Sequence, residues 1–549
     1  MFSQQKRTIT GQVAGDDGMP IPGAAVLIQG TTTGVITDEN GKYSIQAGNF
    51  DVLVFSSLGF KDDVQSVNDR KQINVVLVSD TKVLDDAVVI GYGTQKKSDL
   101  TGSVGIVSME EILSPATGTA DQALQGRIAG VDILSGGGEP GQATSIRIRG
   151  TRSISAGNDP LIVVDGVVDA VESFSDINPD DIKNITVLKD ASSTAIYGAR
   201  GSNGVILVTT KGGNTGAKVS LTFSASVGMS ELPKKLDVMN ATEFAQFRND
   251  YRLMSSYGQS SGTQPYHPQN GERYPFENPS VYGQGTDWQD VLTRKALQQE
   301  YKIAMNYGDS KSHSYASFGY EKRDGIVIGT GMQKYTALLK LDRKIFSWLK
   351  VGFRGNFAFR RNDRNSVTIN GVGNGSAICL SPLVGPTDEW NRYSDEGGSG
   401  GSVYNSPYLI ATQATNYVNI KYLNMAPWIE IYPFKGATLK STFSAGWTDN
   451  DAYSYSPATL PLAKVRKTGG TAARITDDRT SILSETTFSW KKTFKKSHNL
   501  EVMGGFTAGR KTTNYKYTRG IGYLDDNVGP YNMGAIMDRR NLTERSSLS

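Results

Sequence analysis

The chain has 549 residues, of which 38% are hydrophobic and 20% charged, with a mean hydropathy of −0.35 and a net charge of +4. This length predicts about three or four domains, and the small charge excludes the basic face that nucleic acid requires. No segment approaches the roughly 20 apolar residues of a membrane helix, which excludes a helical membrane protein but not a β-barrel, whose strands alternate and average to polar.

The N-terminus lacks the basic and apolar regions of a signal peptide. Structured sequence begins almost at once, at Thr8. We therefore expect the chain to start at or near a mature N-terminus.

Residues 1–80 are predicted to form a small β-sandwich, because short β-rich stretches are separated by turn clusters such as Asp38-Glu-Asn-Gly. The pattern Pro20-Ile-Pro-Gly-Ala-Ala-Val, followed by Thr37-Asp-Glu-Asn-Gly-Lys-Tyr, resembles the carboxypeptidase-regulatory-like domain, a transthyretin-type sandwich. It has no histidine, cysteine or catalytic set, so we interpret it as a non-catalytic module. The predicted strands are 9–13, 25–29, 34–37, 42–46, 52–56 and 73–78.

Residues 81–94 are predicted to be a linker with an extended motif. The motif consists of Ala87, Val88, Val89, Ile90, Gly91 and Tyr92. A β-branched run beside glycines can add as a strand to the sheet edge of another protein. The alternative is an ordinary strand of the next domain.

Residues 95–216 are predicted to be a compact α/β domain, and segment 181–211 is its clearest part. Stretch 182–188 is β-rich, and Asp190 can cap a helix over 191–197. Three glycines then permit a tight reversal into the apolar run 205–208. Other predicted elements are a helix over 120–128, a turn over 136–141 and strands over 145–149 and 161–164.

Segment 181–211 closely resembles the end of the plug domain of TonB-dependent outer-membrane transporters of the SusC/RagA family. The resemblance implies that residues 87–92 are a TonB box, through which periplasmic TonB delivers energy from the inner-membrane proton gradient. It implies that a membrane β-barrel follows the plug. It also implies a plug signature at Asp190, Tyr197, Gly198, Arg200, Gly201 and Gly204.

Residues 217–549 are predicted to be the N-terminal portion of such a barrel. Apolar and small polar residues alternate from 219 to 229. Between 349 and 360, apolar residues alternate with Lys350, Arg354, Asn356 and Arg360. We expect the polar set to face a watery lumen and the apolar set to face lipid.

Strand spacing supports the barrel. Short and mostly long connections alternate, as in outer-membrane barrels with their short turns in the periplasm. The predicted strands are 218–229, 299–308, 313–320, 333–343, 348–360, 418–432, 437–447, 481–492 and 498–508. Aromatic residues at the short joins match an interfacial girdle; they are Phe346, Trp348, Tyr432, Phe434, Trp490 and Phe494.

Nine strands are an odd number, and a tenth begins near Arg545. The resemblance implies a barrel of about 22 strands. We therefore expect a mainly β fold, in which this chain is the N-terminal half to two-thirds of a larger protein.

Several further residues invite a functional interpretation. Arg147, Arg149, Arg152 and Arg200 are expected to pair with acids of the lumen and so hold the plug, with direct ligand binding as the alternative. Asp165-Gly166 indicates a hairpin turn rather than a catalytic acid. The glycine-rich stretch 136–141 lacks the Lys-Ser/Thr of a P-loop, which favours a structural turn.

Aromatic residues of the long loops stack on sugars or pack on one another, and neither alternative is preferred. They are Tyr266, Tyr274, Tyr282, Trp288, Trp390, Tyr393 and Tyr404.

Catalytic chemistry has no visible basis in the sequence. The only cysteine, Cys379, cannot form an intramolecular disulfide. Three scattered histidines without a second cysteine do not make a zinc site. We expect no catalytic residue, no metal and no cofactor, so the protein is not an enzyme.

The function expected from the resemblance is TonB-dependent import of oligosaccharides or peptides across the cell outer membrane, with the plug and the N-terminal domain on the periplasmic side. The implied partners are TonB, a SusD-like surface lipoprotein and outer-membrane lipid, and not nucleic acid. Two alternatives stay open: a siderophore or cobalamin receptor, and a secreted β-rich adhesion or binding protein.

Overall fold

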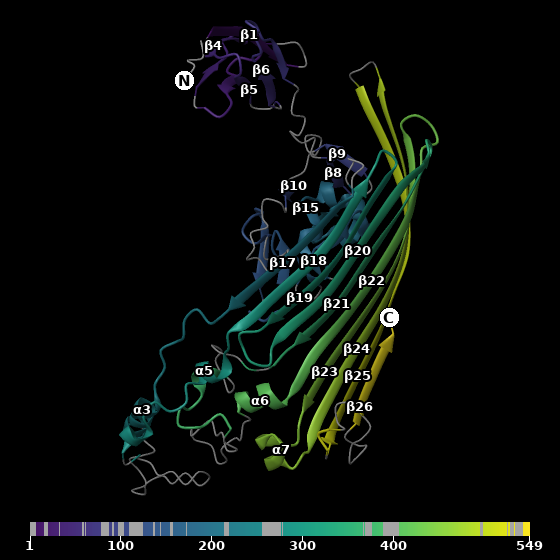
Figure 1. Ribbon diagram of the computed structural model, residues 1–549. Helices are drawn as coiled ribbons and strands as arrows, with labels where there is room; N and C mark the ends of the chain where they lie inside the picture. The colour runs from purple at the N-terminus through teal and green to yellow at the C-terminus, as the bar shows by residue number, and fades with distance from the viewer. Residues whose placement is uncertain are drawn as a thin grey trace. The chain divides into compact units, whose positions relative to one another are not determined.

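The protein was examined as a computed structural model, which is mainly β as predicted (Figure 1). The chain forms two compact units, residues 1–101 and 102–549. The structure describes residues 7–15, 20–31, 33–57, 60, 62–77, 87–90, 93–96, 104–108, 124–135, 138–142, 144–153, 157–168, 170–171, 173–213, 219–254, 276, 278–365, 367, 376–387, 406–494, 498–523, 525–527, 532 and 542–548.

The first unit is a β-sandwich, which confirms the prediction. Its sheets have the orders β4-β1-β7 and β3-β2-β5-β6, around a core that includes Ile9 and Phe55. Only β6 has no sequence signal, because Asp63–Ser66 contains a single apolar residue. The strands are β1 (Arg7–Gly15), β2 (Ala25–Ile28), β3 (Gly34–Ile36), β4 (Lys42–Ala47), β5 (Val52–Ser56), β6 (Asp63–Ser66) and β7 (Val75–Leu77).

A two-stranded hairpin follows the sandwich along the chain. β8 (Ala87–Ile90) pairs antiparallel with β9 (Gly93–Lys96), so that Val88 lies opposite Gln95. The predicted extended conformation is confirmed for residues 87–90. The pairing of this strand with β9 is not predicted from the sequence. Gly91 and Tyr92 lie outside the described residues.

The second unit begins with a small α/β domain, here called the plug, whose described residues lie between 104 and 213. Its main sheet has the order β10-β15-β16-β13-β14, and β11 pairs with β12. The central strands β15 and β16 are apolar on both faces, as expected for strands covered on both sides. The strands are β10 (Val104–Ser108), β11 (Val131–Ser135), β12 (Thr144–Ile148), β13 (Leu161–Val164), β14 (Val167–Val168), β15 (Ile182–Leu188) and β16 (Val205–Thr210).

The helical part of the plug differs from the prediction. In place of one helix over 191–197, α2 (Ala191–Thr194) continues into the 3-10 helix η5 (Ala195–Gly201), which is kinked at Gly198. The carboxylate of Asp190 makes no capping hydrogen bond. It is drawn instead to Arg149, whose Nη1 lies 2.6 Å from Asp190 Oδ1. Residues 120–123 of the helix predicted over 120–128 lie outside the described residues, and of the described part only Leu124 is helical while 125–128 form a turn and a bend.

The rest of the second unit is a ten-stranded antiparallel sheet, here called the wall, with the order β17 to β26. All nine predicted strands and the tenth are present, but β24 begins before the predicted start at 481 and β25 continues well past the predicted end at 508. The strands are β17 (Ser220–Ser230), β18 (Ala296–Gly308), β19 (Ser312–Asp324), β20 (Gly331–Phe346), β21 (Leu349–Asp363), β22 (Thr415–Ile431), β23 (Ala437–Ser456), β24 (Gly470–Phe494), β25 (His498–Tyr523) and β26 (Leu542–Leu548).

The wall has two chemically different faces, as predicted. On β21 the residues facing the plug, such as Arg354 and Arg360, are 4% and 6% exposed. The opposite face is apolar and exposed, with Phe357 and Leu339 among its residues. We call these the inward and the outward face.

Aromatic residues mark two levels on the outward face. Phe346 stacks on Trp348 at the short β20–β21 join, with ring centroids 5.6 Å apart. Tyr320 and Tyr335 pack at 5.0 Å on neighbouring strands. Tyr335 and Phe346 are eleven positions apart on β20, which at about 3.4 Å per residue and a tilt near 45° is about 26 Å of height. This matches the apolar band of about 25 Å that crosses an outer membrane.

Short helices lie in the longer connections, at the strand ends opposite the short joins (Figure 1). Trp288 is buried in one such loop cluster, and its indole N–H donates to the carbonyl of Ser381 at 3.0 Å. Among the described residues no helix is long and apolar enough to cross a membrane. The α-helices are α3 (Ala241–Met254), α5 (Trp288–Leu292), α6 (Pro407–Gln413) and α7 (Pro461–Arg466).

Candidate functional site

The plug is bound to the wall through carboxylates that sit at its turns. Asp181 ends the short 3-10 helix η4 (Pro179–Asp181), which begins at the capping residue Asn178 and leads into β15. Its Oδ1 lies 2.8 Å from Lys302 Nζ on β18. The Tyr315 hydroxyl donates to Oδ1 at 2.6 Å and the Ser317 hydroxyl to Oδ2 at 2.8 Å. One plug carboxylate thus receives three inward groups from two wall strands.

Asp165 makes a second such contact from the β13–β14 turn. The turn requires positive φ at both central residues, 51° at Asp165 and 83° at Gly166, so the predicted hairpin is confirmed. The Asp165 carboxylate lies 3.1 Å from Lys340 Nζ and 3.2 Å from Arg354 Nε. It also accepts hydrogen bonds from the backbone N–H and the hydroxyl of Thr210.

The electrostatics of Asp165 favour its charged form. Burial by itself would raise the pKa of Asp165, but Lys340, Arg354 and the two hydrogen bonds from Thr210 together hold this pKa below its ordinary value. The carboxylate is therefore ionised at neutral pH, and both wall cations keep their counter-charge.

A third acid and several neutral contacts complete the interface. Asp176, in the 3-10 helix η3 (Phe174–Asp176), lies 3.5 Å from Arg360 Nη1. The amide of Asn362 donates to the carbonyl of Gly141 at 3.0 Å, and the Tyr422 hydroxyl donates to the carbonyl of Ala170. The wall residues in the plug's apolar core are Ala358, Tyr422 and Ala426.

Ion pairs and hydrogen bonds of this kind can hold the plug firmly on the wall and still allow the two surfaces to separate. Removing one partner of a buried ion pair costs about 3–5 kcal/mol, because the other charge stays buried alone. When both surfaces separate together, every charged group regains water. A mainly polar interface therefore fixes the position of the plug without the large penalty of exposing an apolar core.

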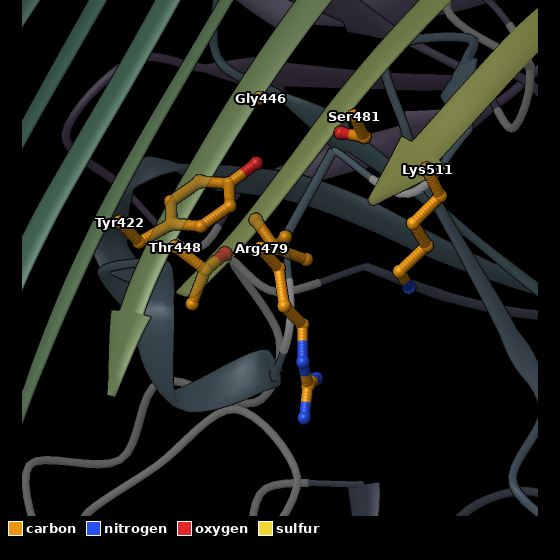
Figure 2. A pocket seen from close by; sticks show the side chains of 7 residues that line it. Tyr422, Gly446, Thr448, Arg479, Ser481 and Lys511 are labelled. Carbon is orange, nitrogen blue, oxygen red and sulfur yellow. The ribbon is translucent and has the colours of Figure 1, made fainter. Parts of the chain in front are cut away.

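A cavity of about 140 Å³ lies between Val171 of the plug and the inward face of β22 to β25 (Figure 2). Arg479 and Lys511 extend from neighbouring strands into the same space. The ion pairs described above lie on β18, β20 and β21, so this polar cavity borders the plug on another side.

The plug-signature residues come together around the α2–η5 turn. Gly198 and Gly204 adopt φ values of 59° and 91°, and a Cβ on Gly204 would lie 2.7 Å from Ile148 Cδ1. Tyr197 and Gly201 are buried, whereas Arg200 is exposed. The geometry explains why glycine is needed at this reversal; a direct role of the signature in transport stays a prediction.

The sequence predicts that cations of the plug pair with acids of the wall. The ion pairs described above have the opposite arrangement, so this prediction is wrong for them. Two of the four plug arginines have partners inside the plug: Arg149 pairs with Asp190, and Arg152 donates to the carbonyl of Ser202. The acids come from the plug and the cations from the wall. Short side chains at plug turns can present carboxylates closely, whereas long lysine and arginine side chains can reach inward from the strands.

Asp176 and Asp181 have no distinctive sequence signal, because acids in turns are common. Lys302, Lys340, Arg354 and Arg360 do have one, since each occupies an inward position in an alternating strand. Among the loop aromatics, Tyr282 packs on Phe276 at 5.4 Å, which together with Trp288 favours packing over sugar contact. Residues 266, 274, 390, 393 and 404 lie outside the described residues.

Comparison with known proteins agrees with this architecture. The family profile TonB-dependent Receptor Plug Domain matches residues 96–205, and the profile CarboxypepD_reg-like domain matches residues 9–90. A TonB-dependent receptor of Formosa agariphila is 35% identical over 98% of this chain and 53% of its own length. The TonB-dependent receptor SusC of Bacteroides thetaiotaomicron is 36% identical over 72% of this chain and 38% of its own length.

Among solved structures, the RagAB peptide importer in its open-open state shares the fold with a TM-score of 0.65. It is 24% identical, over 84% of this chain and 53% of that chain. The chain thus spans about half the length of the proteins it matches.

A wall of alternating strands with a docked α/β plug defines an outer-membrane β-barrel receptor. The relatives carry the names of receptors and a transporter rather than of enzymes, in agreement with the prediction. The chain belongs to the SusC/RagA family of TonB-dependent receptors.

Proposed function

We propose that this chain forms the gated half of a TonB-dependent importer that carries oligosaccharides or peptides across the outer membrane. The observation that carries the proposal is the buried ionic interface of Asp165, Asp176 and Asp181 with the wall. Such an interface closes the passage at rest and permits part of the plug to be displaced.

In this mechanism the extended motif at residues 87–92 serves as the TonB box. TonB pairs with β8 through main-chain hydrogen bonds, which transmit force without side-chain chemistry. Pulling displaces part of the plug, breaks the Asp181–Lys302 and Asp165–Lys340 contacts and opens the lumen. The ionic contacts form again when the tension ends.

The proposed arrangement places the short joins, the plug and the N-terminal domain on the periplasmic side, and the long connections outside. The corresponding domains are residues 1–80, 81–94, 95–216 and 217–549. A SusD-like lipoprotein would cover the outer mouth. Two observations support this partner and the cargo: the relative named SusC, and the neighbour described as the RagAB peptide importer.

Growth tests this function directly. In the parent strain, residues 86–92 of the full-length protein are deleted and growth is measured on single glycans and on defined peptides. A deletion of residues 79–85, equally long and next to the motif, is the matched control. We expect growth on the cognate substrate to be lost only with the first deletion. Uptake that survives it would show that the motif is not the TonB box.

A further inference from the structure

The outward face of the wall has a hollow near the short joins, on the opposite side of the sheet from the plug contacts. Its cavity volume is about 470 Å³, and its lining includes Tyr307, Ser312, Ser314, Leu341, Arg343 and Phe353. Asp342 also belongs to the lining, but its carboxylate is paired with His313 and Lys350. Ser314 precedes Tyr315, which points inward to Asp181. Since successive side chains of a strand point to opposite faces, the hollow is separate from the plug interface.

Strand register explains why the hollow exists. Tyr307, Ser314, Leu341 and Phe353 lie opposite one another in a row across β18 to β21. In the next row, Ser312 lies opposite Arg343. Ser314 therefore sits between large neighbours on both sides, and Ser312 next to Arg343 on one side. The Tyr307 hydroxyl donates to the Asp309 carboxylate at 3.2 Å, and this hydrogen bond fixes the tyrosine ring at one side of the hollow.

Arg343 gives the hollow a charged end. Its side chain is exposed, and no other described residue forms an ion pair with it. The carboxylate of Asp309 is already engaged, because it accepts hydrogen bonds from the N–H groups of Lys311 and Ser312, both at 2.7 Å, and from Tyr307. These N–H groups lower the pKa of Asp309 and the charge of Arg343 helps to lower it, but the described side chains of Arg343 and Asp309 form no ion pair, so the guanidinium donors can still reach a ligand.

The position of Arg343 indicates the chemistry of that ligand. Arg343 lies three residues before Phe346 of the aromatic pair at the β20–β21 join, the level where lipid headgroups meet acyl chains. Leu341 and Phe353 lie deeper in the apolar band. A guanidinium beside two hydroxyls matches a phosphate, and an apolar groove running away from it matches an acyl chain.

We propose that this hollow binds one phospholipid of the periplasmic leaflet, with its phosphate at Arg343, Ser312 and Ser314 and one acyl chain along Leu341 and Phe353. The proposal rests on the orientation given under the proposed function, in which the short joins face the periplasm. The lipid would anchor the wall at the edge where β18 to β21 also hold the plug.

Native mass spectrometry of the full-length protein tests the site, with phosphatidylglycerol added to the delipidated protein. Ser314→Leu fills the hollow and Arg343→Gln removes its charge, so we expect each to lower the bound fraction about tenfold. Arg343→Lys keeps the charge and retains part of the binding. The matched controls are Ala337→Leu and Arg361→Gln, which alter outward positions of β20 and β21 outside the hollow and leave binding within about twofold.

Equal binding by wild type, Ser314→Leu and Arg343→Gln would overturn the proposal. So would co-purification of lipopolysaccharide in place of phospholipid at this position, because lipopolysaccharide belongs to the other leaflet. The variant lacking residues 86–92 separates this proposal from the proposed function. It should bind phosphatidylglycerol like the wild type, even though its growth fails.

Discussion

The ammonium group of Lys302 lies 2.8 Å from a carboxylate oxygen of Asp181, and the two side chains are only 6% and 4% exposed. One belongs to the wall and the other to the plug. This pair is buried between the two parts that the proposed mechanism separates, so it indicates how much free energy that separation requires.

Lys302→Met should loosen the plug, because Asp181 then stays buried without its cation. We expect a loss of about 3–5 kcal/mol in plug docking, seen as faster hydrogen exchange in β15 and as increased leakage of large antibiotics into cells. Lys491→Met is the matched control. Its partner Glu501 is also close, at 2.9 Å, but the two side chains are 52% and 36% exposed, so the change should be about 0–1 kcal/mol. Equal effects would contradict a special role for the buried pair.

Acid should release the Asp165 contact only at low pH. Because the folded-state pKa of Asp165 lies below its usual value, its stabilisation is complete above about pH 4 and is lost as the pH falls through the folded-state pKa. Calorimetry should therefore show that this group adds no pH dependence to the stability between pH 5 and 7. Asp165→Asn should lower the free energy of unfolding at neutral pH and should make the stability fall less steeply as the pH is lowered below about 4. Asp132→Asn, at an exposed plug acid, should keep the wild-type profile.

Alkali should destabilise the N-terminal sandwich. Burial raises the pKa of Tyr43 to about 12, although Arg70 opposes the shift, and the hydroxyl donates to the Ile73 carbonyl at 2.9 Å. A raised folded-state pKa means that this stabilisation is complete below about pH 10 and is lost between about pH 10 and 12, by about 2–3 kcal/mol. Denaturant titration of residues 1–101 against pH measures the loss. Tyr43→Phe should be less stable by about 1 kcal/mol at pH 7 and should lack the alkaline step.

The β8–β9 hairpin allows a test of how the proposed TonB box would pair with TonB. Val88 and Gln95 lie opposite each other, so Val88→Cys with Gln95→Cys can form a cross-strand disulfide in the oxidising periplasm. Within the described residues this sheet has two strands, which leaves β8 one open edge for an added strand. We expect the oxidised variant, made in a Cys379→Ser background, to transport normally. Loss of transport that a reductant restores would mean that the hairpin must open first.

Gly204→Ala should disturb the packing of the plug. The new Cβ would lie 2.7 Å from Ile148 Cδ1, at a residue with φ of 91°. Positive φ and overpacking together should cost about 2–4 kcal/mol, measured as a lower unfolding temperature of the plug. Gly212→Ala is the control, because a Cβ there meets no atom within 4 Å. A Gly204→Ala variant as stable as this control would refute the geometric reason for glycine.

Sequence periodicity predicts the wall well, and its limits have a physical cause. The apolar alternation around Phe443 and Trp447 locates β23, yet β24 begins at Gly470, eleven residues before the predicted start. That extension carries Arg474 and Asp477, so it lacks the apolar face on which the prediction depends. The plug strand Leu161–Val164 is predicted to the residue because it is continuously apolar, and Ile182–Leu188 because it is rich in residues that favour β-strands.

The candidate site is less accessible to sequence reasoning. Inward alternation identifies Arg354 and Arg360 as lumen cations, but nothing local tells which acids face them. Asp176 and Asp181 meet the wall only through the packing of η3 and η4 against it. The TonB-box and plug-signature assignments stay predictions, since geometry explains their conformation and not their role.

The sign of the interface has one more consequence. When the plug is displaced in the proposed mechanism, four cations of the wall lose the plug carboxylates that neutralise them. They are Lys302, Lys340, Arg354 and Arg360. These four cations create a positive field at the plug contacts, whereas the inward acid Glu321 stays paired with the wall cation Lys334. The same field would attract the plug acids Asp165, Asp176 and Asp181 back to the wall, so that reclosing needs no further input of energy.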